Sequence, residues 1–174
     1  MSLQTKTYSK NLSSKNMTLT LTLTENSVNV ANNTSNITYK LVIKSNGSYW
    51  FSDHSHGYNV TLNGTSVANL THVSNKNQIS LAAGASLTVC SGTTDIAHDS
   101  DGGLDMSVSY SFYTGYTGTI SGTGTMTLTD IARGLVYIGN GSSYDAYEVY
   151  IGNGTSWDKY IPYIGNGTDW DVCS

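Results

Sequence analysis

The sequence predicts an all-β fold, a β-sandwich followed by short β-hairpin repeats, and three observations lead to this prediction. Charged residues make up only 11% of the 174 residues, and the chain has a single proline. Thr, Tyr and Val, which favour strands, are frequent instead. Short segments of period-two alternation separated by turn signals recur along most of the chain. Near the C-terminus one short phrase occurs three times at a fixed spacing, which marks a repeated structural unit.

Strictly alternating segments mark the predicted strands of the sandwich. Residues 1–16 read as an extended polar lead-in, and residues 17–24 alternate, with leucines toward a core and threonines toward water. We expect Glu25-Asn26 to form a turn before a second strand at residues 27–30. Later predicted strands cover residues 37–43, 49–51, 58–62, 65–68, 79–81, 87–90, 106–112 and 126–129. Several short strands with turn signals between them are typical of a β-sandwich.

The repeats begin after a boundary that we place at about residue 133. Residues 1–133 then form the sandwich domain, and residues 134–174 hold three 13-residue aromatic hairpin repeats. Each repeat contains Tyr-Ile-Gly-Asn-Gly followed by a second aromatic residue. Asn-Gly favours a two-residue type I′ loop, because both of its residues tolerate positive φ. That loop would place three aromatic pairs directly across the hairpins: Tyr137 with Tyr144, Tyr150 with Trp157, and Tyr163 with Trp170.

These aromatic rings are the candidate binding residues, and two interpretations of them stay open. In the first, the rings of Tyr137, Tyr144, Tyr150, Trp157, Tyr163 and Trp170 are platforms on which sugar rings stack. In the second, the rings pack the repeats against each other or join subunits of a homo-oligomer, because a single hairpin is only marginally stable in water.

Two short motifs contain residue types that bind metals. Asp99 and Asp101 lie in Asp-Ser-Asp-Gly-Gly, which supplies carboxylates at a sharp turn but lacks the later acidic positions of a calcium loop. We interpret it as a strand connection. His54 and His56 would share one face of a strand and could bind a transition metal, but beside Gly57 we expect them to lie in a solvated loop. No metal or other cofactor is therefore expected.

Several function classes find no support in the sequence. The eight basic residues are scattered and the net charge is −4, which argues against nucleic-acid binding. No apolar run is long enough to span a membrane, and the N-terminus lacks the apolar region of a signal peptide. No catalytic motif is present, so we do not expect an enzyme. Cys90 and Cys173 could pair, but two free thiols fit the sequence better.

Several segments resemble Ig-like domains of tail-associated structural proteins of Gram-positive siphophages. They are residues 21–35 (LTLTENSVNVANNTS), 96–102 (IAHDSDG) and 122–133 (GTGTMTLTDIAR), together with the terminal Tyr-Ile-Gly-Asn-Gly repeats. The family commonly has proline where Ala132 stands, which affects the geometry expected of the linker. The resemblance implies an Ig-like β-sandwich and a virion component assembled in the host cytoplasm, on the tail or the capsid surface.

From the resemblance and the aromatic repeats together we expect a virion structural protein that contacts other virion proteins and adheres to host cell-wall carbohydrate. The alternative is a purely architectural virion protein whose repeats mediate oligomerisation.

Overall fold

The computed structural model describes residues 3–12, 16–47, 51–53, 56–73, 79–114, 118–132, 135–139, 142, 144–160, 162–165, 168 and 170–172. The secondary structure of these residues consists of strands and turns without a helix, so the all-β prediction is confirmed. Accordingly, no helix in the described part of the chain is long and apolar enough to cross a membrane.

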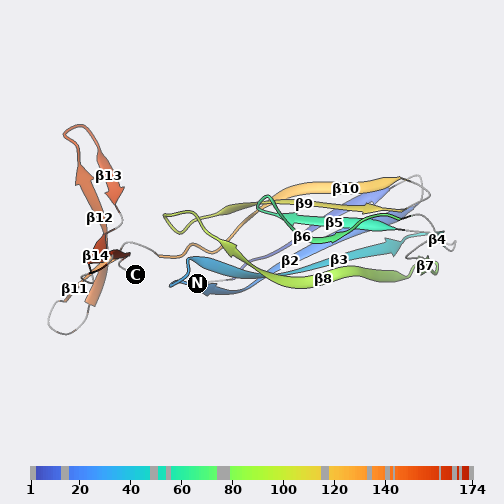
Figure 1. Cartoon of the computed structure of the whole chain (residues 1–174), viewed down its shortest axis with the longest axis horizontal. Helices are drawn as coiled ribbons and strands as arrows, with labels where there is room; N and C mark the ends of the chain where they lie inside the picture. The colour runs from blue at the N-terminus through green and yellow to red at the C-terminus, as the bar shows by residue number, and fades with distance from the viewer. Residues whose placement is uncertain are drawn as a thin grey trace.

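Two four-stranded antiparallel sheets lie one over the other (Figure 1). The first sheet has the order β1-β2-β3-β8, formed by β1 (Thr5–Leu12), β2 (Met17–Asn29), β3 (Thr34–Ser45) and β8 (Ser86–Ala97). The second has the order β10-β9-β5-β6, formed by β5 (Gly57–Leu62), β6 (Thr65–Leu70), β9 (Asp105–Tyr113) and β10 (Thr119–Thr127). The short strands β4 (Phe51–Asp53) and β7 (Ile79–Leu81) pair separately.

The C-terminal strands lie beyond one end of these two sheets (Figure 1). Strands β11 (Leu135–Gly139), β12 (Tyr144–Gly152) and β13 (Trp157–Tyr160) form a three-stranded antiparallel sheet, called the terminal sheet below. Strands β14 (Tyr163–Gly165) and β15 (Trp170–Val172) form a two-stranded sheet.

The core between the two large sheets follows from the alternation of the strands. In β2 the leucines at positions 19, 21 and 23 are fully buried, while the intervening threonines are partly exposed. Strands β3, β9 and β10 bury their alternate apolar residues in the same core. The fully buried members of the core with the largest side chains are Met17, Leu19, Leu21, Leu23, Ile37, Leu41, Ile43, Leu62, Met106, Phe112 and Met126.

Two predictions about the first 30 residues need correction. Within the predicted lead-in, residues 5–12 form an edge strand that pairs with β2 from Thr5↔Thr24 to Leu12↔Met17. The predicted turn at Glu25-Asn26 is wrong, because β2 continues to Asn29 with a register shift between Glu25 and Ser27. A charged residue in an alternating segment suggested a turn, whereas the carboxylate is in fact buried and hydrogen-bonded.

Glu25 is 1% exposed and accepts hydrogen bonds from three separate segments. The Gln4 backbone N–H donates to Oε2 at 3.1 Å, and the Ser35 hydroxyl donates to Oε1 at 2.7 Å. Thr129 donates its hydroxyl to Oε2 at 2.6 Å and its backbone N–H to both oxygens at 3.2 Å. Burial acts to raise the pKa of Glu25, but the bonds from Thr129, Ser35 and Gln4 outweigh it and lower this pKa below its usual value.

His98 extends this network toward the adjoining turn. Its Nε2 lies 2.8 Å from the Ser35 Oγ, and its Nδ1 lies 2.8 Å from the Gly102 carbonyl oxygen. A carbonyl only accepts, so Nδ1 carries a proton. The single hydroxyl proton of Ser35 is donated to Glu25. His98 thus links Ser35 of β3 to the β8–β9 turn within a buried site.

Aromatic rings lie over glycines where two strands pair. Tyr110 of β9 stands directly opposite Gly122 of β10, and Tyr39 of β3 stands opposite Gly92 of β8. A Cβ added at Gly122 would lie 2.5 Å from the phenol Cζ of Tyr110, which is closer than real Cβ contacts. These glycines are therefore required for space, because the neighbouring ring occupies the volume of their missing side chain.

Gly122→Ala should therefore destabilise the sandwich by about 1–3 kcal/mol, because Tyr110 is 4% exposed and has little room to move. Urea unfolding followed by far-UV circular dichroism measures this loss. Ser121→Ala, at the exposed neighbouring position, is the control and should stay close to wild type. If the two variants were equally stable, the ring would not depend on the glycine.

Glu25→Gln should lower the free energy of unfolding at neutral pH by about 1–3 kcal/mol, since the buried donors lose a charged acceptor. The folded-state pKa of Glu25 lies below its ordinary 4.5. Its stabilisation is thus complete above that pH and is lost as the pH falls through the folded-state value. The variant should lose this part of the acid dependence in urea titrations across the acid range, whereas Asp95→Asn, at an exposed position, should retain it. Identical acid slopes in wild type and Glu25→Gln would contradict the assignment.

Candidate functional site

The C-terminal repeats form antiparallel pairs whose register differs from the predicted one by two residues. Trp157 stands opposite Gly152, and Tyr150 stands opposite Lys159. The predicted direct pairing of Tyr150 with Trp157 is therefore wrong. The pairings of Tyr137 with Tyr144 and Tyr163 with Trp170 are wrong in the same way. Tyr144 stands opposite Gly139, Tyr137 opposite Ala146, Trp170 opposite Gly165, and Tyr163 opposite Val172.

The loop between β12 and β13 explains this register. Asn153 accepts hydrogen bonds at Oδ1 from the backbone N–H groups of Thr155 (3.0 Å) and Ser156 (2.9 Å). Its amide donates to the Ser156 hydroxyl at 2.8 Å. Of the Asn-Gly pair only Gly154 has positive φ, at 93°. The asparagine thus organises a four-residue loop through its side chain, where a type I′ loop would need positive φ at both residues.

Another Asn-Gly pair, between β5 and β6, forms the two-residue loop. Asn63 and Gly64 have φ values of 46° and 78°, and Leu62 pairs directly with Thr65 across them. The β5–β6 connection is therefore the two-residue hairpin that the sequence predicts. Both loops have the same sequence, Asn-Gly-Thr-Ser, so local residue types do not explain the difference. The longer loop is distinguished by the contacts that the Asn153 side chain makes with Thr155 and Ser156.

The observed register pairs the first glycine of each repeat with the aromatic residue that follows the repeat phrase Tyr-Ile-Gly-Asn-Gly, in all three copies. At Gly152 an added Cβ would lie 3.3 Å from the indole ring of Trp157, so the ring lies against the glycine backbone. Packing of an aromatic ring over a cross-strand glycine is known to stabilise strand pairs.

Pro162 interrupts the pattern in the third copy. Val149, the equivalent residue of the second copy, lies inside the nine-residue strand β12, which pairs with β11 through its first half and with β13 through its second. The corresponding segment around Pro162 is split into β13 and β14. Proline has no N–H for a strand ladder, which explains the break.

One face of the terminal sheet combines an aromatic ring with charged and polar groups. Side chains alternate along a strand, so Glu148, Tyr150 and Gly152 of β12 share a face with Trp157 and Lys159 of β13. We call these five residues the platform face. The Trp157 side chain is 75% exposed and Tyr150 is 48% exposed. This face therefore presents an indole ring to solvent, held in place by the glycine behind it.

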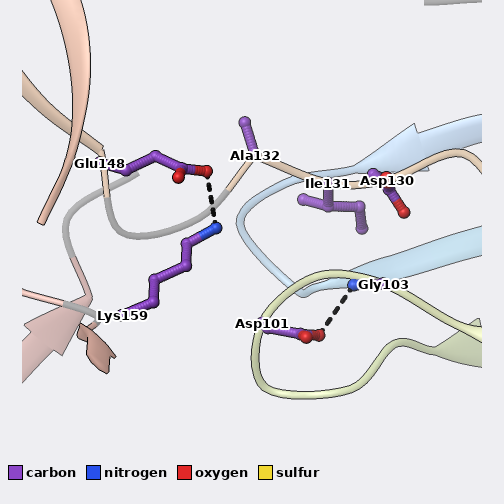
Figure 2. Close-up of a pocket in the computed structure, with 7 residues that line it drawn as sticks. All are labelled: Asp101, Gly103, Asp130, Ile131, Ala132, Glu148 and Lys159. Carbon is purple, nitrogen blue, oxygen red and sulfur yellow. Dashed lines mark hydrogen bonds and ion pairs between the residues drawn. The ribbon is translucent and has the colours of Figure 1, made fainter. Parts of the chain in front are cut away.

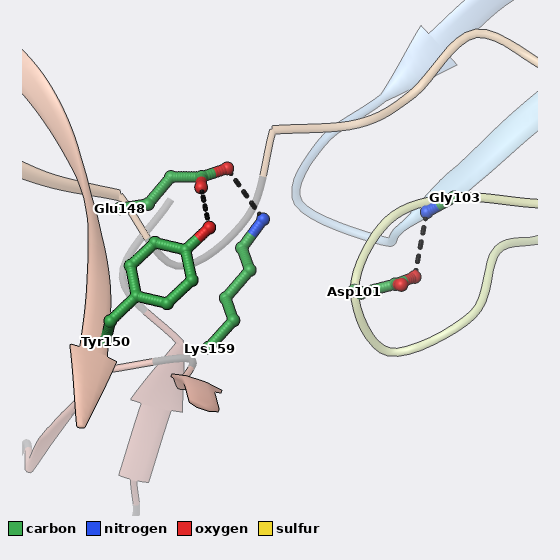
Figure 3. Close-up of polar contacts among 5 residues, drawn as sticks. All are labelled: Asp101, Gly103, Glu148, Tyr150 and Lys159. Atoms are coloured by element: carbon green, nitrogen blue, oxygen red, sulfur yellow. Dashed lines mark hydrogen bonds and ion pairs between the residues drawn. The ribbon is translucent and has the colours of Figure 1, made fainter. Parts of the chain in front are cut away.

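The polar groups of the platform face hold one another (Figure 3). The Lys159 Nζ donates to Glu148 Oε1 at 2.7 Å, and the Tyr150 hydroxyl donates to Glu148 Oε2 at 2.6 Å. The hydrogen bonds from Lys159 and then Tyr150 lower the pKa of Glu148, and the same contacts with Glu148 raise the pKa of Lys159 and of Tyr150. Glu148 is thus ionised and Lys159 protonated at neutral pH.

The opposite face of the terminal sheet is mostly apolar, with the carboxylate of Asp158 opposite Ile151. It carries Val136, Tyr147, Val149, Ile151 and Tyr160, all on the side away from Trp157 according to the register. Tyr147, Ile151 and Tyr160 are each about half exposed. Ile151 of the repeat phrase thus lies on the face away from Trp157, together with two tyrosines.

A pocket of about 250 Å³ lies where the terminal sheet meets the end of the sandwich (Figure 2). Glu148 and Lys159 line one side of it, and residues of the β8–β9 turn and of the segment after β10 line the other. These sandwich residues are Asp101, Gly103, Asp130, Ile131 and Ala132. Asp101 accepts a hydrogen bond from the Gly103 N–H at 3.0 Å, and its charge contributes to the raised pKa of Lys159. The platform face thus continues into an acidic pocket.

Of the remaining predicted metal candidates and cysteines, Asp101 lines the pocket, and the others lie apart from the platform face or outside the described residues. Asp99 and Asp101 belong to the turn that connects β8 and β9, as expected for a strand connection. His54 and Cys173 lie outside the described residues, and the His56 ring stacks on Phe112 with ring centroids 5.7 Å apart. Within the described part of the chain, His, Cys, Asp and Glu side chains form no group of three that could hold a metal.

Cys90 lies half-buried on β8 with a free thiol. Burial raises the pKa of this thiol to about 11, against a smaller opposing effect of a hydrogen bond with the Leu41 backbone. The thiol is therefore protonated at neutral pH and a poor nucleophile.

Sequence reasoning missed Glu148 and Lys159 as members of the site. Glu148 is one of only two glutamates in the chain, and Lys159 follows Trp157 by two residues. The two-residue spacing between Trp157 and Lys159 predicts that the cation lies on the same strand face as the indole ring. Their contact depends on the register, which the assumed two-residue loop gave incorrectly.

Asn153→Ala should open the β12–β13 hairpin locally, since it removes the side-chain acceptor of two backbone N–H groups. Amide hydrogen exchange within β13, measured by NMR, should become about five- to ten-fold faster, as expected for roughly 1 kcal/mol. Asn69→Ala, at an exposed position of β6, is the control. Unchanged exchange in β13 would show that the asparagine does not hold the loop.

A comparison with protein-family models finds no match, and a search of curated proteins finds none either. What the chain does is therefore inferred from the geometry of the platform face and from the sequence motifs.

Proposed function

We propose that this chain is a structural component of a bacteriophage virion, on the tail or the capsid surface, and that its platform face adheres to host-surface carbohydrate. The resemblance of residues 21–35, 96–102 and 122–133 to tail-associated proteins of Gram-positive siphophages supports the virion part. One observation carries the adhesion part: the Trp157 ring is 75% exposed, rests on Gly152 and adjoins hydrogen-bonding groups. Sugars bind proteins by stacking an apolar ring face on such an aromatic surface, with hydroxyls bonded at its edge.

We also propose that the sandwich is Ig-like. Strands β2, β3 and β8 would correspond to strands A, B and E of an immunoglobulin domain, and β5, β6, β9 and β10 to strands C, C′, F and G. The order β10-β9-β5-β6 then equals G-F-C-C′, and β2-β3-β8 equals A-B-E, as in that fold. Strand β1 is an addition at the edge of the first sheet.

Adhesion of this kind is weak at one site. A stacked ring with a few hydrogen bonds gives low affinity, and several copies of the chain on one particle would raise it through avidity. The design suits a virion, because a particle that carries many weak sites attaches firmly while each site exchanges rapidly.

The opposite face of the terminal sheet supports a second function, oligomerisation. A three-stranded sheet with half-exposed Tyr147, Ile151 and Tyr160 gains stability when another copy covers these residues. In this alternative the chain is purely architectural, and other virion proteins or further copies are its partners.

We do not propose a catalytic role. A glycosidase needs one carboxylic acid whose pKa is raised so that it can donate a proton. In the pocket beside the platform face, Lys159 and Tyr150 lower the pKa of Glu148 instead. This arrangement keeps the carboxylate ionised and favours binding.

Variants on the two faces distinguish the two functions. Trp157→Ala should weaken sedimentation of the protein with purified Gram-positive cell walls by about ten-fold or more, through loss of the stacking surface. Its oligomeric mass, measured by light scattering, should stay unchanged. Tyr147→Ser with Ile151→Ser on the opposite face is the matched control, which should retain wall binding at each site. Wild-type wall binding by Trp157→Ala would contradict the adhesion proposal, and a lower mass of the control variant would support the architectural one.

A further inference from the structure

The charges around the platform face bear on which carbohydrate it can bind. Glu148 and Lys159 form an ion pair at 2.7 Å and contribute no net charge together. The described residues on the opposite side of the pocket add two carboxylates, Asp101 and Asp130, and no cation. A ligand that extends from Trp157 into the pocket therefore meets a surplus of negative charge.

The hydrogen-bonding capacity of the ion pair suits neutral hydroxyl groups. An ammonium has three N–H donors and a carboxylate has about four acceptor positions. The contacts of Lys159 and Tyr150 with Glu148 use one ammonium donor and two of the acceptor positions. One sugar hydroxyl could therefore accept from Lys159 while its neighbour donates to Glu148. The ion pair would then bind two adjacent hydroxyls without a charge on the ligand.

A phosphate-bearing polymer lacks this complementarity. Its phosphate would compete with Glu148 for Lys159 and would approach the carboxylates of Asp101 and Asp130. Like charges brought together at an interface suppress the wrong ligand. The net charge of −4 on the whole chain acts in the same direction over longer distances.

We propose that the platform face selects uncharged sugar units and rejects phosphate-bearing glycopolymers. This inference rests on the proposed adhesion function and names its ligand class. Trp157 supplies the stacking surface, Glu148 and Lys159 bind adjacent hydroxyls, and Asp101 and Asp130 exclude anions from the pocket.

The test uses the full-length protein and the indole N–H signal of Trp157 in NMR titrations. The neutral probes are tetrasaccharides of glucose, galactose and N-acetylglucosamine, and the anionic probe is a glycerol phosphate oligomer of similar length. At least one neutral probe should shift the signal with an affinity that stays the same at about 0.05 and 0.5 M salt. The glycerol phosphate oligomer should bind at least about ten-fold more weakly at the lower salt concentration.

The outcomes separate this inference from the function on which it rests. If no probe shifts the Trp157 signal, the adhesion proposal fails, and the ligand class fails with it. If the glycerol phosphate oligomer binds as tightly as the best neutral probe, adhesion stands and the selection of uncharged sugars is overturned.

A charge variant tests the role of the pocket directly. Asp101→Asn with Asp130→Asn should strengthen binding of the glycerol phosphate oligomer about five-fold or more at low salt, and should leave neutral binding within about two-fold. The first substitution keeps an Oδ1 acceptor for the Gly103 N–H. Asp95→Asn with Asp105→Asn changes the net charge equally at exposed, hydrogen-bonded positions that do not line the pocket, and this variant should have a smaller effect. Equal effects of the two double variants would overturn the assignment to Asp101 and Asp130.

Discussion

The buried carboxylate of Glu25 is the interaction on which the arrangement of the candidate site depends. It binds the N-terminal segment through Gln4, strand β3 through Ser35, and the segment that leaves β10 through Thr129, 104 residues away in sequence. A buried charge is stable only where donors replace its lost water, so these segments must meet at this point. Ile131, two residues beyond Thr129, is buried and lines the pocket beside the terminal sheet. The sandwich side of the pocket is thus positioned by hydrogen bonds to one buried carboxylate.

One packing device recurs in both parts of the chain. In the sandwich, Tyr110 lies over Gly122, and in the terminal sheet Trp157 lies over Gly152. The consequences differ because the surroundings differ. Within the sandwich the Tyr110 ring is nearly fully buried and belongs to the core, whereas in the terminal sheet the same arrangement leaves the Trp157 ring 75% exposed. The same contact of a ring with a glycine thus stabilises the core at Tyr110 and leaves the ring of Trp157 available for binding.

The sequence predicts those features of the fold that depend on local periodicity. The alternation of residues 17–24 places the leucines of β2 in the core, as expected. Features that depend on distant partners were missed. A charge in an alternating segment suggests a turn at Glu25, and no local pattern reveals that Gln4 and Thr129 supply donors to its buried carboxylate. Asn153 belongs to the same motif as Asn63, and only the side-chain contacts made in the folded loop distinguish a four-residue turn from a two-residue turn.

Pro162 has a consequence for how such an array can grow. Strand β12 serves two hairpins at once, so each further copy with valine at this position would add one strand to the same sheet. A sheet built this way has no inherent length limit, and its last strand always offers an unpaired edge to other chains. Proline at the start of the third copy ends the growing sheet after β13. Pro162 therefore sets the number of strands in the terminal sheet. Further copies inserted before Pro162 would add strands to this sheet, and the sheet would still end at the proline.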